Sequence, residues 1–479
     1  MVTLLIDWLL RLVQRRMNGL ASRRTLARVA RRAWLPRSEK IPESETEFGA
    51  GLLHHLQEKR LRSTIRFAAK NSPYYRELFE THRMRPADVR SVSDLRQLPV
   101  TDSEAMNDWR KFLAVPQEQL LVVAGSAGTG PTRKTVAFTA ADWNQVCTAR
   151  AVAIGMLIGS RRAPGVAKTT GDGDRAAGKG ALMILPPASA GWVDSRLFRD
   201  ALARTGVPLF EAGTDAPEEA VRLLVEFTPA LLIGTPHSLD ILTRCAADVG
   251  FAYRPSAIIS LADALSTAVL SRLNVHWDSA VVACYGSAEL GGAQSVAFSS
   301  CRGTHLNALD LIVEILDPET GDPAALGDLV VTTLLRRAMP LIRYRTGDTA
   351  RWVQHECRLP FPSLEILGSR TGVLFRNRTI GARELSECIA GVPGTSGRLL
   401  WRYENAASGG GSSVAIERAG YGPGSATDEN EILVQLRRAI ESALPPGTSA
   451  ALRGDRLAIS VCDDLPGQIR NVRIEDHST

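Results

Sequence analysis

Ala-Met-Pro-Leu-Ile-Arg-Tyr-Arg-Thr-Gly-Asp-Thr-Ala-Arg-Trp, residues 338–352, is the stretch from which the fold can best be argued. Its alternating apolar and polar residues predict a strand, a turn at Thr346-Gly347 and a second short strand. Such a turn would hold the Asp348 carboxylate at a strand end, where it could accept hydrogen bonds from the paired hydroxyls of a ligand. Taken alone, the run is explained more simply as a plain hairpin with an aspartate in its turn. The rest of the chain must decide between these interpretations.

Length and composition predict a large domain with a smaller one. A chain of 479 residues is too long for one ordinary core, and 44% hydrophobic residues are typical of a globular protein. No apolar run reaches the 18 or more residues of a membrane span. The seven cysteines are odd in number and mostly isolated, which argues against a disulfide framework and for a reducing compartment. We therefore expect a cytoplasmic protein.

The positive charge is concentrated at the amino end. Residues 1–40 hold ten Lys/Arg against Asp7 and Glu39, a net of +8, so the total of +6 leaves residues 41–479 at −2. That balance argues against a nucleic-acid partner. The apolar start and the arginine pairs of this extension suit an amphipathic helix on an anionic membrane or on a partner protein. A solvated helix packed on the body of the protein explains them equally well.

A glycine-rich stretch follows the first helices. Periodicity predicts a helix over 51–70, and Ser72-Pro73 predicts the cap and first turn of another. An apolar strand at 120–124 then runs into Gly-Ser-Ala-Gly-Thr-Gly-Pro-Thr-Arg-Lys, residues 125–134. Small residues, hydroxyls and cations suit a phosphate chain, although a Gly-rich turn alone is weak evidence for a nucleotide site. The stretch is not a Walker A loop, because Pro131 stands where a lysine must follow the second glycine.

Residues 181–284 alternate between short apolar runs and helical segments. The runs at 181–185, 230–234, 257–261 and 280–284 predict buried parallel strands, with helices between them. Ligands bind at the carboxyl ends of such strands. The segment Tyr285-Gly286-Ser287-Ala288-Glu289 therefore falls where a ligand is expected. From Leu311 the pattern predicts a small antiparallel unit beside the α/β body. Residues 160–180 have almost no large apolar side chains, so we expect them to form a surface loop.

Three stretches in order and spacing carry a family resemblance: Cys284 to Glu289, Ala338 to Asp348, and Leu367-Gly368-Ser369-Arg370. The sequence resembles the adenylate-forming enzymes, and most closely their phenylacetate-CoA ligase branch. The resemblance implies an α/β fold with a large adenylate-forming amino-terminal domain, built of parallel βαβ sheets and a small β-barrel-like unit, and a small α+β carboxyl-terminal domain. We expect a basic extension at 1–40, a core domain at 41–368 and a mobile domain at 369–479.

The resemblance also implies a reaction and site residues. In the family, a carboxylic acid reacts with ATP and Mg²⁺ to give an acyl-adenylate, and the acyl group then passes to coenzyme A. Tyr285 would stack on adenine beside Gly286 and Ser287, Glu289 would hold magnesium, and Asp348 would bind the AMP ribose. Arg370 would lie near ribose or phosphate, although Ser369 competes for that position. The family's phosphate-binding loop matches this chain at Ser126, Gly128 and Thr129.

One departure from the family lies at the carboxyl end. Where the family places a lysine that bridges carboxylate and phosphate oxygens, this chain has Arg470, and all seven lysines lie at or before Lys179. Arginine is a planar fork and not a point charge, so the exchange is not conservative. Losing one aimed donor typically costs about 3 to 4 kcal/mol of transition-state stabilisation. Two hypotheses follow: an acid:CoA ligase that uses Glu289 and Arg470 in catalysis, or an impaired relative that serves as a binding or scaffold module.

A second group of residues suits a structural zinc ion. Cys301-x3-His305 and His355-x-Cys357 are two close pairs of thiol and imidazole ligands, which tetrahedral zinc prefers. Buried cysteine acting as a small apolar residue is the competing explanation. Some members of the resembled branch carry a Cys/His zinc site in these loops.

We also expect a small carboxylic acid substrate, aromatic or biosynthetic, and a homodimer. Candidates for lining the acid pocket are Trp192, His237 and Asp263.

Overall fold

The computed structural model describes most of residues 43–369 and shorter stretches beyond them. The described ranges are 43–125, 134–159, 180–185, 193–214, 216–261, 265–293, 295–298, 303–354, 362–369, 373–375, 378–380, 387, 392, 395–403, 412–418, 431, 434–435, 438–439, 457–462 and 474–476. Residues 1–40 and all but the last residue of the predicted surface loop at 160–180 lie outside them. No helix among the described residues is both long and apolar enough to cross a membrane.

The helices begin with a long one at the amino end. The α-helices are α3 (Glu43–Asn71), α4 (Pro73–Thr81), α5 (Ala140–Gly159), α6 (Val193–Thr205), α7 (Pro217–Phe227), α8 (Pro236–Asp248) and α9 (Thr267–Trp277), and three 3₁₀ helices span Ser93–Gln97, Ser103–Phe112 and Gln117–Gln119. Ser72 stands at the predicted cap of α4, but its hydroxyl makes no capping bond and donates instead to the Lys111 carbonyl at 3.0 Å. The proline at the first turn is therefore the signal that starts α4.

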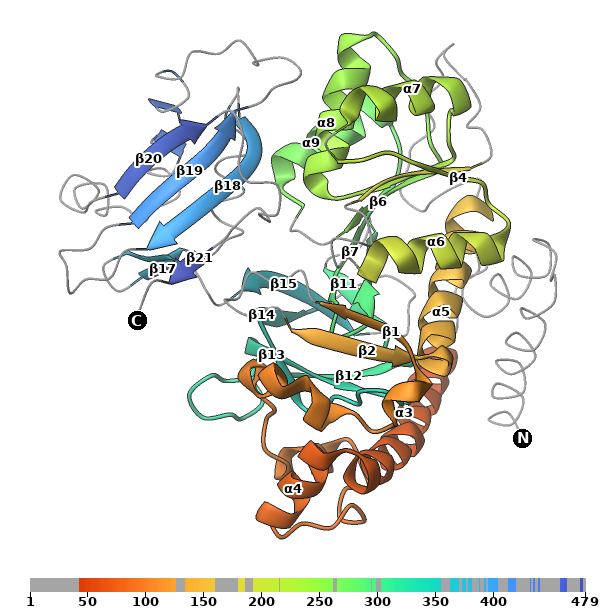
Figure 1. Cartoon of the computed structure of the whole chain (residues 1–479), viewed down its shortest axis with the longest axis vertical. Helices are drawn as coiled ribbons and strands as arrows, with labels where there is room; N and C mark the ends of the chain where they lie inside the picture. Colours follow the sequence, from red (N-terminus) through yellow and green to blue (C-terminus); the bar gives the residue numbers. More distant parts are fainter. Residues whose placement is uncertain are drawn as a thin grey trace.

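Eleven strands form one hydrogen-bonded network (Figure 1). Its order is β12 (Leu311–Leu316), β13 (Leu326–Thr333), β14 (Tyr344–Val353), β15 (Ser363–Ser369), β11 (Thr304–Leu306), β10 (Ser295–Phe298), β7 (Val281–Cys284), β6 (Ala257–Leu261), β5 (Leu231–Gly234), β3 (Ala181–Ile184) and β4 (Leu209–Glu211). The strands from β7 to β4 pair in parallel, and the others pair antiparallel. The predicted antiparallel unit thus continues the parallel strands.

Strand β10 joins the two parts because its ends pair with different neighbours. Ser295 and Val296 pair with β11, whereas Ala297 and Phe298 pair with β7. Helices cover both faces of the parallel part. Side chains of α7, α8 and α9 pack with Leu182 and Ile258 on one face, and those of α5 and α6 pack with Met183 and Ile259 on the other. This alternation explains why these strands are apolar throughout.

The remaining strands form smaller sheets. Strands β1 (Leu120–Gly125) and β2 (Thr135–Thr139), β8 (Gly286–Ser287) and β9 (Gly292–Ala293), and β16 (Val373–Phe375) and β17 (Arg378–Ile380) form three antiparallel pairs. Strands β18 (Thr395–Tyr403), β19 (Ser412–Arg418), β20 (Leu457–Cys462) and β21 (Ile474–Asp476) form a separate four-stranded sheet, drawn in blue in Figure 1.

The hairpin predicted within 338–352 is wrong. Residues 344–353 form one continuous strand, β14, and the expected turn at Thr346-Gly347 is a bulge inside it. On β13, Val330 pairs with Arg345 while Asp328 pairs with Thr349, so three residues of β14 face one residue of β13. Gly347 permits this because its φ is +88°, a conformation that costs glycine little. Asp348 therefore projects from the middle of a strand and not from a strand end.

Candidate active site

The turn after β7 supplies the first half of the site. Tyr285 follows the last residue of β7, and Gly286 and Ser287 form β8, which pairs with β9. Between β8 and β9 the chain makes a tight turn in which the Leu290 amide donates to the Ser287 carbonyl at 3.1 Å. Glu289 lies in this turn. The site thus begins at the carboxyl end of a parallel strand, where ligands bind in open α/β sheets.

Strand β14 supplies the second half of the site through Tyr344 and Asp348. The Tyr344 ring is fully buried and packs in the core formed by α3, α4 and residues 338–342. At the bulge, the Asp348 amide donates to the Thr346 hydroxyl at 3.1 Å, and that hydroxyl donates to the Leu329 carbonyl at 3.0 Å. These bonds compensate for the interrupted strand pairing. They also fix the direction in which Asp348 leaves the strand.

Asp348 and Tyr285 form a close polar pair. The Tyr285 hydroxyl donates to Asp348 Oδ2 at 2.5 Å, a distance typical of a strong bond to an anion. Burial raises the pKa of Tyr285 well above its ordinary value, and the negative charge of Asp348 raises it further. The phenol is therefore protonated throughout the physiological pH range and acts as a donor. It occupies one position on a carboxylate that has room for further donors.

Glu289, Tyr344 and Lys134 form a second polar cluster. The Lys134 ammonium donates to the Tyr344 hydroxyl at 2.9 Å and lies 3.5 Å from Glu289 Oε1, and the Tyr344 hydroxyl donates to the same carboxylate oxygen at 3.3 Å. The Glu289 side chain is only 7% exposed. Burial, followed by the charge of Glu289, raises the pKa of Tyr344. A buried carboxylate beside an ammonium group is suited to bind both a cation and an anion.

Two buried arginines hold the turn that carries Glu289. Arg336 Nη2 donates to the Leu290 carbonyl at 2.8 Å, and Arg150 Nη2 donates to the Gly291 carbonyl at 3.0 Å. Gly291 has a φ of +90°, and a Cβ there would lie 2.8 Å from Arg336 Nη2. The turn therefore requires glycine at this position. Its geometry is fixed by side chains from α5 and from the segment before β14.

The structure brings together the predicted residues that it describes. Tyr285 lies against Asp348, while Gly286 and Ser287 lead into the turn that carries Glu289. The Ser287 hydroxyl oxygen is buried and makes no hydrogen bond within the described residues. The ligand roles assigned to these residues stay predictions. His237, a candidate for the acid pocket, is partly exposed in the first turn of α8.

Several predicted residues lie outside the described part of the chain. These are Ser126, Gly128, Thr129, Trp192, Asp263, Cys301, His355, Cys357, Arg370 and Arg470. One neighbour of Arg370 is informative, because Ser369 is the cross-strand partner of Asp348 in the pairing of β14 with β15. Ser369 is therefore the last residue of the strand that lies beside Asp348.

Sequence reasoning assigned no role to Lys134 or Tyr344. Lys134 ends the glycine-rich stretch, and Tyr344 stands inside the 338–352 stretch. Tyr344 and Asp348 are an even number of residues apart in a strand, which is a signal that could have placed them on one face. The contact of both Lys134 and Tyr344 with Glu289 has no local signal, because 55 residues separate Glu289 from Tyr344.

The predicted zinc site is represented by one described ligand. His305 lies on β11, where it is 2% exposed and pairs with Ser363 and Val296. The three other candidates are outside the described residues. Among the described residues, no group of three or more His, Cys, Asp or Glu side chains is arranged to hold a metal. The zinc site stays a prediction.

Comparison with solved structures defines the class of fold. The chain matches a 2-hydroxyisobutyryl-CoA ligase in its postadenylation state with a TM-score of 0.70 and 17% identity, covering 93% of this chain and 94% of that one. The same ligase in its thioesterification state matches with a TM-score of 0.58, 18% identity, and coverage of 92% and 94%. The fold is that of the adenylate-forming CoA ligases, as predicted.

Comparison of sequences narrows the likeness to one kind of ligase. The phenylacetate-coenzyme A ligase of Aromatoleum evansii is 28% identical over 355 residues, 71% of this chain and 76% of that protein. The phenylacetate-coenzyme A ligase of Thermus thermophilus is 26% identical over 332 residues, 67% of this chain and 69% of that protein. No protein-family model matches the chain. The resemblance to phenylacetate-CoA ligases indicated by the motifs is confirmed.

Proposed function

We propose that the protein is an AMP-forming acid:CoA ligase. Its substrate carboxylate would attack the α-phosphorus of ATP and displace pyrophosphate, which gives an acyl-adenylate. The thiol of coenzyme A would then attack the acyl carbon and release AMP. The observation that carries the proposal is the pairing of Tyr285 with Asp348 and of Lys134 with Glu289 at the end of a parallel strand. The similarity to CoA ligases in sequence and fold supports it.

Each described residue has chemistry that suits this reaction. Asp348 has acceptor positions beyond the one that Tyr285 fills, and the two ribose hydroxyls would donate to them. Lys134 would turn from Glu289 toward the phosphates of ATP. Glu289 offers a carboxylate oxygen, the ligand that Mg²⁺ prefers, and substrate phosphates commonly supply the others. Glu289 is therefore suited to hold magnesium, which would neutralise phosphate charge when bound.

The proposal is tested by ATP–pyrophosphate exchange with a panel of carboxylic acids. We expect exchange with at least one aromatic or biosynthetic acid, and thioester formation when coenzyme A is added. An absence of exchange with every acid, in protein that still binds ATP, would contradict it. Phenylacetate is one acid in the panel and not the assumed substrate.

A second candidate function rests on Arg470. The replacement of the adenylation lysine favours an impaired relative that binds nucleotide or acid without activating it. Exchange activity distinguishes this binding module from a ligase.

We further propose that the protein is cytoplasmic and that residues 369–479 form a separate small domain. Elemental analysis of chelator-free protein tests the zinc prediction, with about one zinc per chain expected for a closed structural site.

A further inference from the structure

A basic pocket lies between α3 and the segment that leads to β14. It has a volume of about 570 Å³, and its lining within the described residues includes five cationic side chains and no carboxylate. Four of these come from α3, and the fifth comes from the segment that leads to β14: Lys59, Arg62, Arg66, Lys70 and Arg337. We call this surface the α3 basic pocket. Its volume is within the range of small-molecule sites.

The pocket follows from the periodicity of α3. Leu61, Ile65 and Ala68 are buried in the core, so the helix presents Lys59, Arg66 and Lys70 to solvent on another side. Residues three or four apart on a helix are neighbours, and like charges at those spacings destabilise it. The exposed positions 59, 63, 66 and 70 carry three cations and a serine, with no acidic residue to offset them. This arrangement costs helix stability, and a bound anion would offset that cost.

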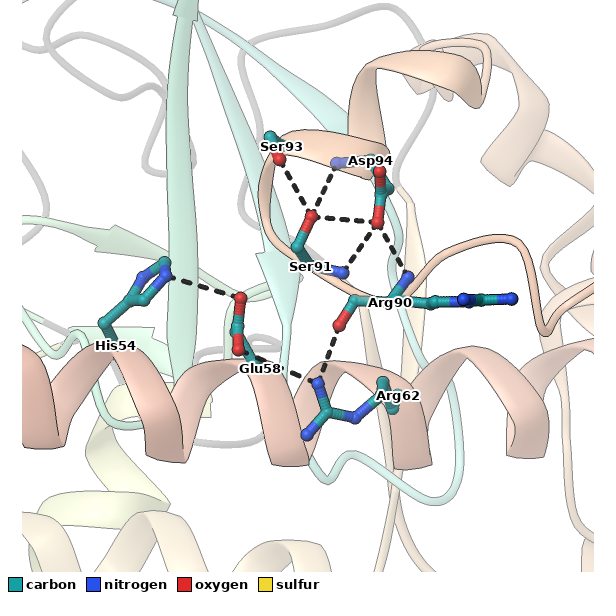
Figure 2. Close-up of polar contacts among 7 residues, drawn as sticks. All are labelled: His54, Glu58, Arg62, Arg90, Ser91, Ser93 and Asp94. Carbon is teal, nitrogen blue, oxygen red and sulfur yellow. Dashed lines mark hydrogen bonds and ion pairs between the residues drawn. The ribbon is translucent and has the colours of Figure 1, made fainter.

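Among the α3 cations that line the pocket, Arg62 is the one that other described residues engage. Figure 2 shows Arg62 between two partners, the Glu58 carboxylate 3.7 Å from Nη1 and the Arg90 carbonyl, which accepts from Nη1 at 2.7 Å. Asp94 accepts from the Arg90 and Ser91 amides at 2.9 and 2.8 Å and holds the loop that presents this carbonyl. Among the described residues, the side chains of Lys59, Arg66 and Lys70 make no such bond.

The second wall of the pocket is also fixed. The Arg337 guanidinium stacks over the Phe67 ring at 4.5 Å, which directs a cation into the pocket. Its backbone amide donates to Asp142 Oδ1 at 2.7 Å, and the Leu335 amide donates to the Thr64 hydroxyl at 3.1 Å. The segment 335–337 is thus bound to α3 and to a buried carboxylate. The two walls face each other without depending on a ligand.

We propose that the α3 basic pocket binds a small anion carrying two or more phosphate groups. Lys59 and Lys70 are 11 helical steps apart, about 16 Å along the helix, which exceeds the reach of a single phosphate. Guanidinium and ammonium groups together suit phosphate oxygens, with bidentate bonds from arginine and point contacts from lysine. The lining residues come from two elements, α3 and the 335–337 segment, which a small ligand could bridge.

The test measures binding of inorganic tripolyphosphate by calorimetry. We expect saturable binding with an affinity that falls as salt is raised. The pocket variant replaces Lys59, Arg66 and Lys70 with glutamine, which keeps helix propensity high, and should weaken binding by about a hundredfold. Arg337→Gln removes one cation from the other wall and should weaken binding by about tenfold. Thermal melts check that each variant is folded.

Two controls separate this pocket from general charge and from the nucleotide site. A triple glutamine variant of the exposed Arg110, Arg222 and Arg254 has the same net charge as the pocket variant and should bind like the wild type. Lys134→Met should also leave this binding intact, because Lys134 belongs to the other site. Equal losses in both triple variants, or a loss in Lys134→Met alone, would overturn the proposal.

Two further probes test whether the pocket instead binds an acidic protein or a lipid surface. A polyglutamate peptide represents an acidic protein, and vesicles of phosphatidylglycerol represent a lipid surface. We expect neither to compete with tripolyphosphate at equal charge concentration. If either bound in a manner lost in the pocket variant while tripolyphosphate did not bind, the surface would be a docking site for a macromolecule and the proposal would be wrong.

Discussion

Asp348 depends on Tyr285 for its position and for one of its hydrogen bonds. In Tyr285→Phe the Asp348 carboxylate would lose a donor 2.5 Å away. A hydrogen bond to a charged group contributes about 1.5 to 3 kcal/mol, so we expect ATP affinity to fall by at least about tenfold. Asp348→Ala should weaken ATP binding more, because it removes the acceptor itself. Equilibrium titration of ATP measures both.

The two substitutions should not be additive. If Asp348 binds ribose and Tyr285 acts through it, the double variant should bind ATP no more weakly than Asp348→Ala alone. Additive losses would mean that Tyr285 contacts the nucleotide independently. Wild-type affinity in Asp348→Ala would remove the ribose role altogether.

Lys134 is the described cation that pairs with Glu289, and its charge should matter for adenylation. In Lys134→Met we expect pyrophosphate exchange to fall by about a hundredfold to a thousandfold, the usual effect of losing one aimed electrostatic donor. Lys111→Met is a matched control, because Lys111 is exposed and away from Glu289. Exchange rates that fall equally in both variants would show a general effect of charge and remove the assigned role.

The bulge in β14 depends on the backbone conformation of Gly347. Gly347 has a φ of +88°, and a Cβ added there would have no atom within 4 Å, so Gly347→Ala introduces conformational strain without a clash. We expect a loss of about 1 kcal/mol in the free energy of unfolding, measured by urea denaturation. The strain should also displace Asp348 and weaken ATP binding.

Gly321→Ala provides a control for that strain. Gly321 has a φ of +75°, is equally open, and lies in the turn between β12 and β13 away from the site. Its alanine variant should lose similar stability and keep ATP affinity. If Gly347→Ala also kept ATP affinity, the bulge would not position Asp348.

The burial of His276, in the last turn of α9, predicts that the stability of the protein depends on pH. Burial lowers the pKa of His276 from 6.5, although a bond to the Phe251 carbonyl at 3.1 Å partly opposes this. The unfolded chain therefore binds a proton more readily than the folded one, so stability present above pH 6.5 is lost as pH falls below it. His276→Gln should reduce this loss in urea midpoints measured between about pH 7 and pH 5. An unchanged pH profile would contradict the assignment.

Helices and strands whose bounds are set by a local sequence pattern were predicted well from the sequence. The strand at 257–261 has the expected bounds, because a continuous apolar run defines it. The bulge was not predictable, because Thr-Gly-Asp suits either a turn or a bulge and the choice depends on pairing with β13. Tyr285, Glu289 and Asp348 were found through motifs, whereas their contacts with Tyr344 and Lys134 depend on the assembled sheet.

At the scale of the molecule, a hydrogen bond links Glu387, in the carboxyl-terminal part of the chain, to a helix that covers the parallel strands. The Thr267 amide, at the first turn of α9, donates to the Glu387 carboxylate at 2.8 Å. A carboxylate at a helix amino terminus is favourable, although an exposed contact of this kind is weak. This bond is therefore easily broken, as movement of the proposed small domain would require.

Arg470 tests whether the small domain completes the active site. If closure brings a cation to the acyl and phosphate oxygens, Arg470 is the candidate that the sequence offers. Arg470→Lys should then raise acyl-adenylate formation by about a hundredfold, because a lysine ammonium could reach both oxygens. Thioester formation from a supplied acyl-adenylate should change much less, since that step does not require this charge. Single-turnover assays of the two half-reactions separate them. A loss in Arg470→Lys would mean that arginine is adapted to its own chemistry, whereas unchanged adenylation in both Arg470→Lys and Arg470→Ala would place residue 470 away from the reacting atoms.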